Sequence, residues 1–356
     1  MTARVFIDGA AGTTGLEIRE RLGRRADLEV FALDDAARKD PKARAAALNE
    51  ADAVILCLPD DAAREAVSMI ENPDVRVIDA STAHRVHPDW TYGFAEMDAG
   101  QRARIAGAKR VANPGCYPTG FIALVRPLVE AGIVPPDYPV TVNAVSGYTG
   151  GGKQMIAQME EAGHPDPIDA PHFLYGLPLK HKHVPEMQVH DLLARAPLFS
   201  PSVGKFPQGM IVQVGGIGGD HLHLREMQVH GKLAHPPVFS PSVGRFYRGM
   251  MVEVPLQLWA LPGKPKPDDL QRTLQDAYKD EPLVQVADSA EEAGLKSLDA
   301  ELLRARNDMR LFVFGNEKAG QARLVAVLDN LGKGAGGAAV QNLNIMLGLP
   351  ETEGLR

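Results

Sequence analysis

Short apolar runs alternate with helical stretches along the first third of the chain, and this alternation constrains the fold more than any other feature. Strand-like runs occupy residues 5–7, 28–33, 53–58 and 75–78, with helical stretches such as residues 16–22 between them. Strands that alternate with helices in this way form a parallel, doubly wound sheet. The pattern predicts an α/β fold that begins with a Rossmann-like domain.

A glycine-rich turn follows the first of these runs. Its glycines are Gly9, Gly12 and Gly15, and Thr13 and Thr14 lie between the last two. Glycines at a strand-to-helix turn let the backbone approach a pyrophosphate, which then binds at the N-terminus of the helix. The spacing G-x-x-G-x-x-G is one residue away from the usual dinucleotide fingerprint, so a purely structural turn is the alternative. The turn favours a dinucleotide site.

Charged residues after the second expected strand bear on the choice of dinucleotide. Asp34 and Asp35 are followed by Arg38 and Lys39. An acid at this place binds a ribose 2′-hydroxyl, whereas cations bind a 2′-phosphate. The two cations favour NADP, and a solvated start of a helix explains them equally well.

Cys116 lies in a turn between a short strand and a helix. Residues 113–115 are Asn-Pro-Gly, a strong turn signal, and residues 119–131 are apolar at helical spacing. A thiol in the first turn of a helix has a lowered pKa, and the unpaired N–H groups there can bind an oxyanion. A small buried hydrophobe is the alternative for a single cysteine. The turn makes Cys116 the candidate nucleophile.

Composition excludes several classes of protein. The chain has 356 residues, which suggests about two domains, and its net charge of −7 gives no basic footprint for nucleic acid or an anionic membrane. There are two cysteines, and Cys57 lies in an apolar run where a buried thiol is expected. This count excludes a disulfide framework and fits a reducing cytoplasm. Because the N-terminus enters a strand directly, we expect no secretion signal or membrane span.

Six stretches together resemble a known family. They read FIDGAAGTTG (6–15), LCLPDD (56–61), DASTAHR (79–85), NPGCYPT (113–119), SGYTGGGK (146–153) and HKHVPE (181–186). In these stretches the chain resembles the shorter type of the N-acetyl-γ-glutamyl-phosphate reductases, a family of the semialdehyde dehydrogenase group. The resemblance covers nearly the whole sequence. It implies NADPH-dependent reduction of an acyl phosphate to an aldehyde, in arginine biosynthesis.

The candidate residues fit that chemistry. A thioester on Cys116 would split the reaction into acyl transfer and hydride reduction. The resemblance selects His183, with its neighbour Glu186, as the group that moves protons near the sulfur.

Further binding residues follow from residue type and from the resemblance. Successive small residues leave N–H groups available to an anion, and a hairpin or a helix cap is the alternative. We expect no metal site. The cofactor candidates, besides the first turn with Arg38 and Lys39, are Pro59, Gly336 and Asn342; the substrate candidates are Ser81, Thr82, Arg85, Asn113, Ser146, Gly147 and Lys182.

The resemblance also implies a discontinuous first domain. In the family the tail of the chain returns to the cofactor domain, so residues 1–115 and 335–356 are expected to form the NADP-binding domain. The tail is expected to include an amphipathic helix. Residues 116–334 are then an α+β catalytic domain, with strands at 140–145, 250–258 and 324–328 and a loop at 263–269.

One feature departs from the family pattern. Residues 183–214 recur in similar form 40 positions later as residues 223–254, which indicates a tandem duplication or an engineered insertion. The second copy supplies an alternative base, His223 with Glu226. Because that copy carries Leu222 and Arg225 where the first has Lys182 and Pro185, we favour His183. Removal of residues 191–230 is expected to restore one family-like segment with activity.

Two other functions stay open at this point. A related dehydrogenase acting on aspartyl phosphate or N-acetyl-aminoadipyl phosphate would carry the same thiol and turn. A dinucleotide-binding regulator that has lost its chemistry is the second alternative. In either case the expected partner is a small molecule, and the family resemblance suggests a homo-oligomer.

Overall fold

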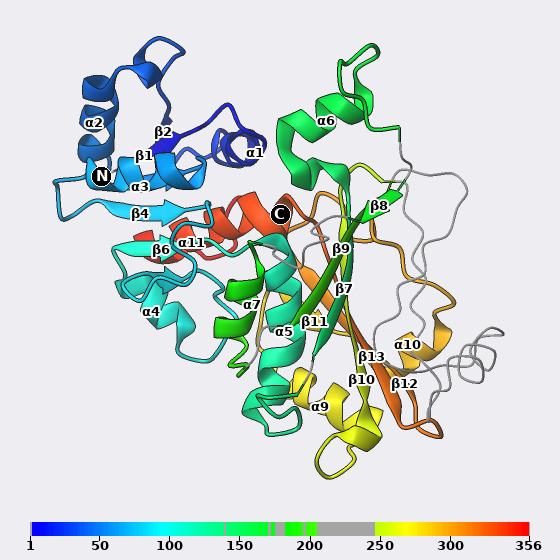
Figure 1. Cartoon of the computed structure of the whole chain (residues 1–356). Coiled ribbons are helices and arrows are strands. Elements are labelled where there is room, and N and C mark those ends of the chain that lie inside the picture. Colours follow the sequence, from blue (N-terminus) through cyan, green and yellow to red (C-terminus); the bar gives the residue numbers. More distant parts are fainter. Residues whose placement is uncertain are drawn as a thin grey trace. The chain divides into compact units, whose positions relative to one another are not determined.

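The computed structural model describes residues 2–138, 140–169, 172–174, 182–194, 197–204 and 246–355. The chain divides into two compact units. Unit 1 consists of Met1–Cys116, Gly151–Gln154 and Leu331–Arg356, and unit 2 consists of Tyr117–Gly150 and Met155–Asn330. In Figure 1, unit 1 therefore contains both the blue and the red ends of the colour scale.

Unit 1 is built on a parallel sheet in the order β2-β1-β3-β4-β6-β5. All of its strand pairs run parallel, so the predicted doubly wound α/β sheet is confirmed. The chain moves outward from β1 to β2 and then returns to the other side of β1 with β3, which makes the ends of β1 and β3 the switch point of the sheet. The strands are β1 (Ala3–Asp8), β2 (Leu28–Phe31), β3 (Ala53–Leu56), β4 (Arg76–Asp79), β5 (Thr91–Tyr92) and β6 (Arg110–Ala112).

The strands of unit 1 form because apolar residues fill them on both faces. Every residue of β3 is buried, as is usual for a central parallel strand. On one face Phe6, Val54 and Val77 pack with Leu48 of the second helix. The helices of the unit are α1 (Thr13–Leu22), α2 (Pro41–Glu50), α3 (Asp60–Ser68), α4 (Gln101–Gly107) and α11 (Gly337–Leu347), with short turns η1 (Ala37–Lys39) and η4 (Gly332–Gly336).

Helix α11 corrects the expectation of an amphipathic helix in the tail. All residues from 337 to 344 are buried. The helix packs against α1, α4 and β4, and Figure 1 shows it in red beside the cyan strands. Because it has no charged residue and neighbours on several sides, it is a core helix.

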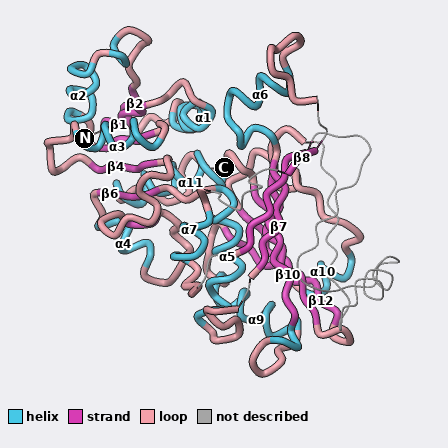
Figure 2. The backbone as a smooth tube through the Cα atoms, viewed as in Figure 1, coloured by secondary structure: helices cyan, strands magenta, loops and turns pink. Residues whose placement is uncertain are grey.

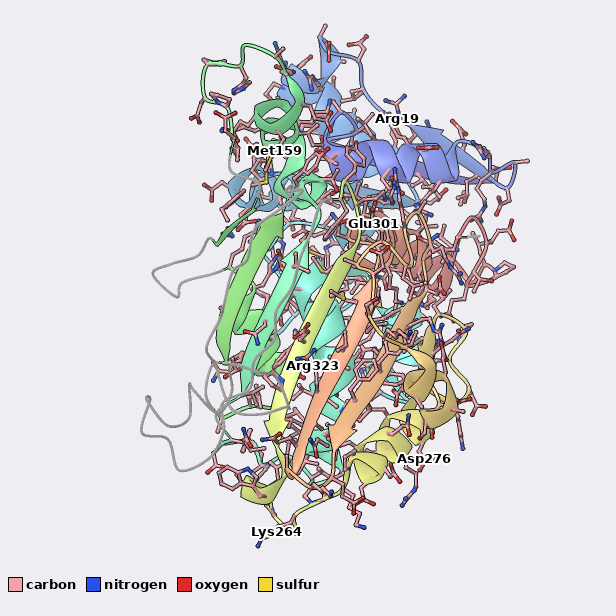
Figure 3. All side chains as sticks on the ribbon, turned by 90° about the vertical axis from the view of Figure 1, so that its right-hand side faces the viewer. Arg19, Met159, Lys264, Asp276, Glu301 and Arg323 are labelled. Atoms are coloured by element: carbon pink, nitrogen blue, oxygen red, sulfur yellow. The ribbon has the colours of Figure 1, made fainter. Side chains whose placement is uncertain are left out.

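Unit 2 contains a mixed sheet in the order β11-β12-β13-β10-β7-β9-β8 among the described residues. Strands β12, β13, β10 and β7 are antiparallel neighbours, whereas β9 lies parallel to β7. Figure 2 shows these strands in magenta, and Figure 3 views the sheet with Arg323 of β13 labelled. The strands are β7 (Thr141–Ser146), β8 (His172–Leu174), β9 (Leu198–Gly204), β10 (Met250–Gln257), β11 (Val284–Val286), β12 (Met309–Asn316) and β13 (Gln321–Leu328).

Helix α5 (Cys116–Glu130) packs against this sheet. A Cβ at Gly120 would lie 2.9 Å from Val252 of β10, so the helix approaches the strand closely because this residue is glycine. The hydroxyl of Tyr278 donates to the carbonyl of Ala123 at 2.9 Å and joins α9 to α5. The other helices are η2 (Tyr148–Gly151), α6 (Gly152–Glu160), α7 (Val184–His190), η3 (Leu258–Ala260), α9 (Pro267–Tyr278) and α10 (Ser289–Gly294).

The expected loop at residues 263–269 is shorter than predicted. Helix α9 begins at Pro267, which occupies its first turn. Proline suits this place because its missing N–H would have no partner inside the helix.

The structure describes different parts of the two copies of the repeat. The first copy supplies α7 and β9 up to Gly204, and the second supplies Phe246 and β10. Phe246 occupies the repeat position of Phe206, so the described parts of the two copies cover different repeat positions. The alternative base His223 and its neighbour Glu226 lie outside the described residues.

Candidate functional site

A cavity of about 310 Å³ lies in unit 1 at the switch point of the parallel sheet. The glycine turn after β1 contributes one wall, and the loops after β3 and β4 contribute others. The short stretch Gly151–Gln154, which belongs to unit 1, adds a lysine. The cavity is lined by Gly12, Thr13, Thr14, Cys57, Leu58, Ala80, Gly152 and Lys153.

The glycine turn is shaped for a close approach. Gly9 has a φ of 85°, and a Cβ there would collide with the carbonyl of Cys57. A Cβ at Gly15 would lie 2.5 Å from the carbonyl oxygen of Gly9. Helix α1 starts from Gly12 with no side chain capping it. An uncapped helix start with a positive dipole end fits the pyrophosphate of a dinucleotide.

The charged residues after β2 form a self-contained turn. Asp34 accepts hydrogen bonds from the backbone N–H groups of Ala36 and Ala37. The guanidinium of Arg38 lies 3.1 Å from Asp35 and is 46% exposed. Lys39 is exposed beside it. Pro59 precedes α3 and follows Leu58 of the cavity.

The loop after β4 is held by two carboxylates. Buried Asp79 accepts hydrogen bonds from the N–H and hydroxyl of Ser81, and it lies 2.6 Å from Nδ1 of His84. Thr82 donates its N–H and hydroxyl to Asp60. The ring of His84 stacks on Trp90. Ser81 and Thr82, predicted to bind substrate, thus take part in the local structure of this loop.

Sequence reasoning gave no role to Asp79 or His84, although both lie in the DASTAHR stretch. A carboxylate five residues before a histidine carries no signal of its own. Their contact depends on how the chain turns after β4.

Cys116 is the first residue of α5, partly exposed, directly after the turn that starts at Asn113. Neither cysteine takes part in a disulfide. Burial raises the pKa of the Cys57 thiol to about 12, and the carboxylates of Asp79 and Asp8 add to this shift. Cys57 is therefore a protonated thiol at neutral pH, and Cys116 is the cysteine with a helix N-terminus.

In unit 2, His183 immediately precedes α7 and is 7% exposed. Its ring centroid lies 5.9 Å from that of Tyr117, the residue that follows Cys116 in the chain. Glu186 is buried in the first turn of α7, and Lys182 is exposed. The structure thus places His183 beside the first turn of α5.

The second glycine-rich loop packs tightly within unit 2. The N–H of Gly147 donates to the carbonyl of Gly249 at 3.0 Å, and a Cβ at Gly147 would lie 2.5 Å from the carbonyl of Tyr247. The hydroxyl of Ser146 donates to the carbonyl of Gly147. These contacts fix the conformation of the loop within unit 2.

The remaining candidates lie in the tail of the chain. A Cβ at Gly336 would come within 3.0 Å of Glu17 on α1, so the tail approaches that helix closely. Asn342 is fully buried and donates to the carbonyl of Gly93 and to Oδ1 of Asn113. Its own Oδ1 has no hydrogen-bond partner among the described residues.

The described residues show neither a metal-ligating cluster nor a membrane-spanning helix. The part of the chain that the structure describes contains no cluster of three or more metal-ligating side chains. None of its helices is long and apolar enough to span a membrane.

Both parts of the chain match models of one protein family. Residues 4–106 match "Semialdehyde dehydrogenase, NAD binding domain". Residues 116–216 and 215–330 both match "Semialdehyde dehydrogenase, dimerisation domain", and the two matches meet between the copies of the duplication. The fold agrees, because the chain superposes on aspartate semialdehyde dehydrogenase II of Vibrio cholerae with a TM-score of 0.65, at 12% identity over 98% of both chains. Together they define a semialdehyde dehydrogenase with a nicotinamide dinucleotide cofactor.

Closer relatives narrow this class. The chain is 55% identical to "N-acetyl-gamma-glutamyl-phosphate reductase" of Brucella anthropi, over 98% of this chain and 99% of that protein. The protein of the same name from Brucella ovis is also 55% identical, over 98% and 100%. The chain belongs to the N-acetyl-γ-glutamyl-phosphate reductase branch of the semialdehyde dehydrogenase family.

Proposed function

We propose that this chain uses NADPH to reduce N-acetyl-γ-glutamyl phosphate to N-acetylglutamate semialdehyde, a step of arginine biosynthesis. The observation that carries the proposal is 55% identity to reductases of that name over nearly the full length of both chains. The position of Cys116 at the start of α5 supports it from the chemical side.

Cys116 is the proposed nucleophile. Its thiolate attacks the acyl carbonyl and expels phosphate, which leaves a thioester on the sulfur. Backbone N–H groups in the first turn of α5 stabilise the oxyanion that forms during this attack. A nicotinamide dinucleotide held in the cavity of unit 1 would supply a hydride, and the thioester on Cys116 would then be reduced to a thiohemiacetal. Cleavage of its carbon–sulfur bond releases the aldehyde and regenerates the thiol.

His183 is the proposed acid–base group. It accepts the proton of the Cys116 thiol before the attack and returns it to the oxyanion when the thiohemiacetal forms. On collapse it takes the hydroxyl proton and passes it to the leaving sulfur. Glu186, three residues further on, orients the imidazole. The packing of His183 against Tyr117, the residue after Cys116, supports this role. His183→Asn is expected to lower kcat by about 100-fold or more, and His223→Asn to leave it within about twofold.

The cavity of unit 1 is the proposed dinucleotide site. Thr13 and Thr14 present the N-terminus of α1, and Lys153 supplies a cation for the phosphates. Gly336 and Asn342 of the carboxy-terminal segment are proposed, from the family resemblance, to lie near the nicotinamide. Arg38 and Lys39 are proposed to favour NADP by binding its 2′-phosphate. Replacing both with alanine is expected to lower the NADPH-to-NADH ratio of kcat/KM about tenfold or more.

Two further properties belong to the proposal. A match to a model described as a dimerisation domain supports a homo-oligomer, which light scattering on the purified chain tests directly. Two cysteines outside any disulfide support a cytoplasmic location.

The decisive assay measures the reverse reaction, the oxidation of the semialdehyde. Phosphate-dependent reduction of NADP with N-acetylglutamate semialdehyde is expected for the wild type, and Cys116→Ala should lose it by about 1,000-fold or more. Faster turnover with aspartate semialdehyde or the aminoadipate analogue would assign a related dehydrogenase. A wild type that binds NADPH but turns over none of these would be the regulator.

A further inference from the structure

Asn113, three residues before Cys116, makes hydrogen bonds through both its backbone and its side chain within unit 1. Its backbone N–H donates to the carbonyl of Asp79 at 2.8 Å, and its own carbonyl accepts from Nε of Arg85 at 3.0 Å. Its side-chain Nδ2 donates to the carbonyl of Ala335 at 3.0 Å, and Oδ1 accepts from Asn342 at 3.1 Å. The residue is 1% exposed. Backbone and side chain are thus both engaged in contacts inside the protein.

Two of these contacts come from the other end of the chain. Ala335 lies in η4 and Asn342 in α11, both within Leu331–Arg356. This segment is itself firmly held, because Lys333 is buried against Glu96 and Asn342 also bonds Gly93. A rigid partner makes the position of Asn113 well defined.

Arg85 holds the same turn from the loop after β4. Besides Nε on Asn113, its Nη2 donates to the carbonyl of Ala80 at 3.1 Å. The guanidinium therefore ties the carbonyl at the start of the Asn-Pro-Gly turn to the end of the parallel sheet. A planar group with several fixed donors is suited to this bridging role.

We propose that Asn113 is a positioning residue, through which Arg85 and the carboxy-terminal segment hold the turn that presents Cys116 at the start of α5. The proposal deepens the function proposed above for Cys116 and rests on it. The turn contains only Pro114 and Gly115 between the two residues, so a shift of Asn113 is passed on to the sulfur. A displaced sulfur loses alignment with the helix N-terminus and with the acyl carbonyl.

Alkylation of the cofactor-free and substrate-free protein tests this role. Iodoacetamide is applied across a pH series, and modification of Cys116 is followed by peptide mass spectrometry, which separates it from Cys57. Asn113→Ala is expected to slow modification at pH 7 about tenfold, as a thiol pKa raised by one unit would. Asn342→Ala should also slow the modification of Cys116. Because the protein is cofactor-free, this slowing would come from the lost contact with Asn113 and not from weaker cofactor binding.

Kinetics separate positioning from substrate binding. In Asn113→Ala, kcat should fall about 10- to 100-fold while KM for the acyl phosphate stays within about twofold. A raised KM with unchanged alkylation would overturn the proposal and make Asn113 a substrate ligand. If the alanine variant is insoluble, Asn113→Ser, which keeps a polar but shorter side chain, is measured in the same way.

Asn49 offers a matched control. Its side chain, on α2 of the same unit, accepts from the N–H groups of Glu71 and Asn72 and donates to the carbonyls of Ala45 and Met69. Asn49→Ala should lower stability and leave Cys116 alkylation unchanged. If Asn49→Ala slows the alkylation of Cys116 as much as Asn113→Ala does, the effect comes from a general loss of stability in unit 1, and the proposal is overturned. Failure of the proposed function would show separately, as a wild type inactive toward acyl phosphates whose alkylation still responds to Asn113.

Discussion

The ammonium of Lys333 lies 2.8 Å from each carboxylate oxygen of Glu96, and both side chains are almost entirely buried. Gln341 completes the group, because its Oε1 accepts from Lys333 and its Nε2 donates to Glu96. Lys333 belongs to η4 and Gln341 to α11, whereas Glu96 follows β5. The three side chains tie the end of the chain to the parallel sheet.

Lys333→Met should destabilise unit 1 strongly. Removing one partner of a buried ion pair leaves the other charge without compensation, at a cost of about 3–5 kcal/mol. The double variant with Glu96→Gln removes the remaining charge and should recover much of the loss. Urea unfolding measures both, with Lys42→Met on the exposed face of α2 as control. A Lys333→Met protein as stable as that control would contradict the prediction.

A deletion of residues 205–244 should leave a folded, active reductase. It removes 40 residues, the length of the repeat, and joins Gly204 to Arg245, which occupies the repeat position of Lys205. Val203 of β9 and Met250 of β10 both pair with Ser146, so they lie about 10 Å apart across β7. The six residues that would connect them span this distance easily.

Circular dichroism and the reverse assay decide the outcome of that deletion. Removal of residues 191–230, the cut suggested by the sequence, is the comparison, because it exchanges the described residues 191–194 and 197–204 for their repeats. A soluble and active 205–244 deletion is expected. An insoluble or inactive product would show that the second copy is required.

Asp191 should make the protein less stable as pH rises. Its carboxyl is fully buried, and neither oxygen has a hydrogen-bond partner among the described residues. Burial raises its pKa well above the ordinary value, and nearby Arg126 opposes this only in part. The unfolded chain loses the proton near pH 4, whereas the folded chain keeps it, so stability falls between pH 4 and the raised folded pKa.

Asp191→Asn tests this dependence. The variant should gain at least about 1.4 kcal/mol at pH 7, which is the free energy of one pKa unit, and match the wild type near pH 4. Urea titrations at both pH values measure it, with exposed Asp169→Asn as control. If the free energies of unfolding of wild type and Asp191→Asn differ by the same amount at both pH values, the buried Asp191 carboxyl is not the source of the pH dependence.

Leu192 carries backbone strain just beyond α7. Its φ is 59°, in the left-handed region, and its side chain is 46% exposed. This conformation costs a residue with a Cβ about 1–2 kcal/mol, which glycine avoids. Leu192→Gly should therefore raise the free energy of unfolding by about 1 kcal/mol, which raises the melting temperature by a few degrees. Leu192→Ala should raise neither. A gain in the alanine variant would point to the lost apolar side chain instead.

The sequence predicted the parts of the fold that depend on neighbouring residues. The apolar runs of β1 and β3 and the turn before Cys116 are local patterns, and the structure confirms the parallel sheet that they imply. Strand β12 was not predicted, because Arg310 and Gly315 interrupt its apolar run. The amphipathic interpretation of α11 was wrong, because its neighbours on several sides come from distant segments.

In the candidate site, too, residues in local patterns could be predicted, whereas contacts between distant segments could not. Gly9, Gly12 and Cys116 could be selected from turn chemistry alone. The contact between Lys333 and Glu96 joins residues 237 positions apart, and no short pattern reports it. Asn113 was predicted to bind substrate, whereas its contacts with Ala335 and Asn342 depend on the folded tail and could not be predicted from the sequence.

The three-part composition of unit 1 has a consequence for biosynthesis. Its first strands emerge from the ribosome early, but α11, which fills its core, belongs to Leu331–Arg356 and emerges last. Unit 2 is synthesised in between and can gather its own strands first. The dinucleotide-binding unit is begun first and finished last, so a nascent chain that stalls before residue 331 exposes the apolar surface that α11 covers.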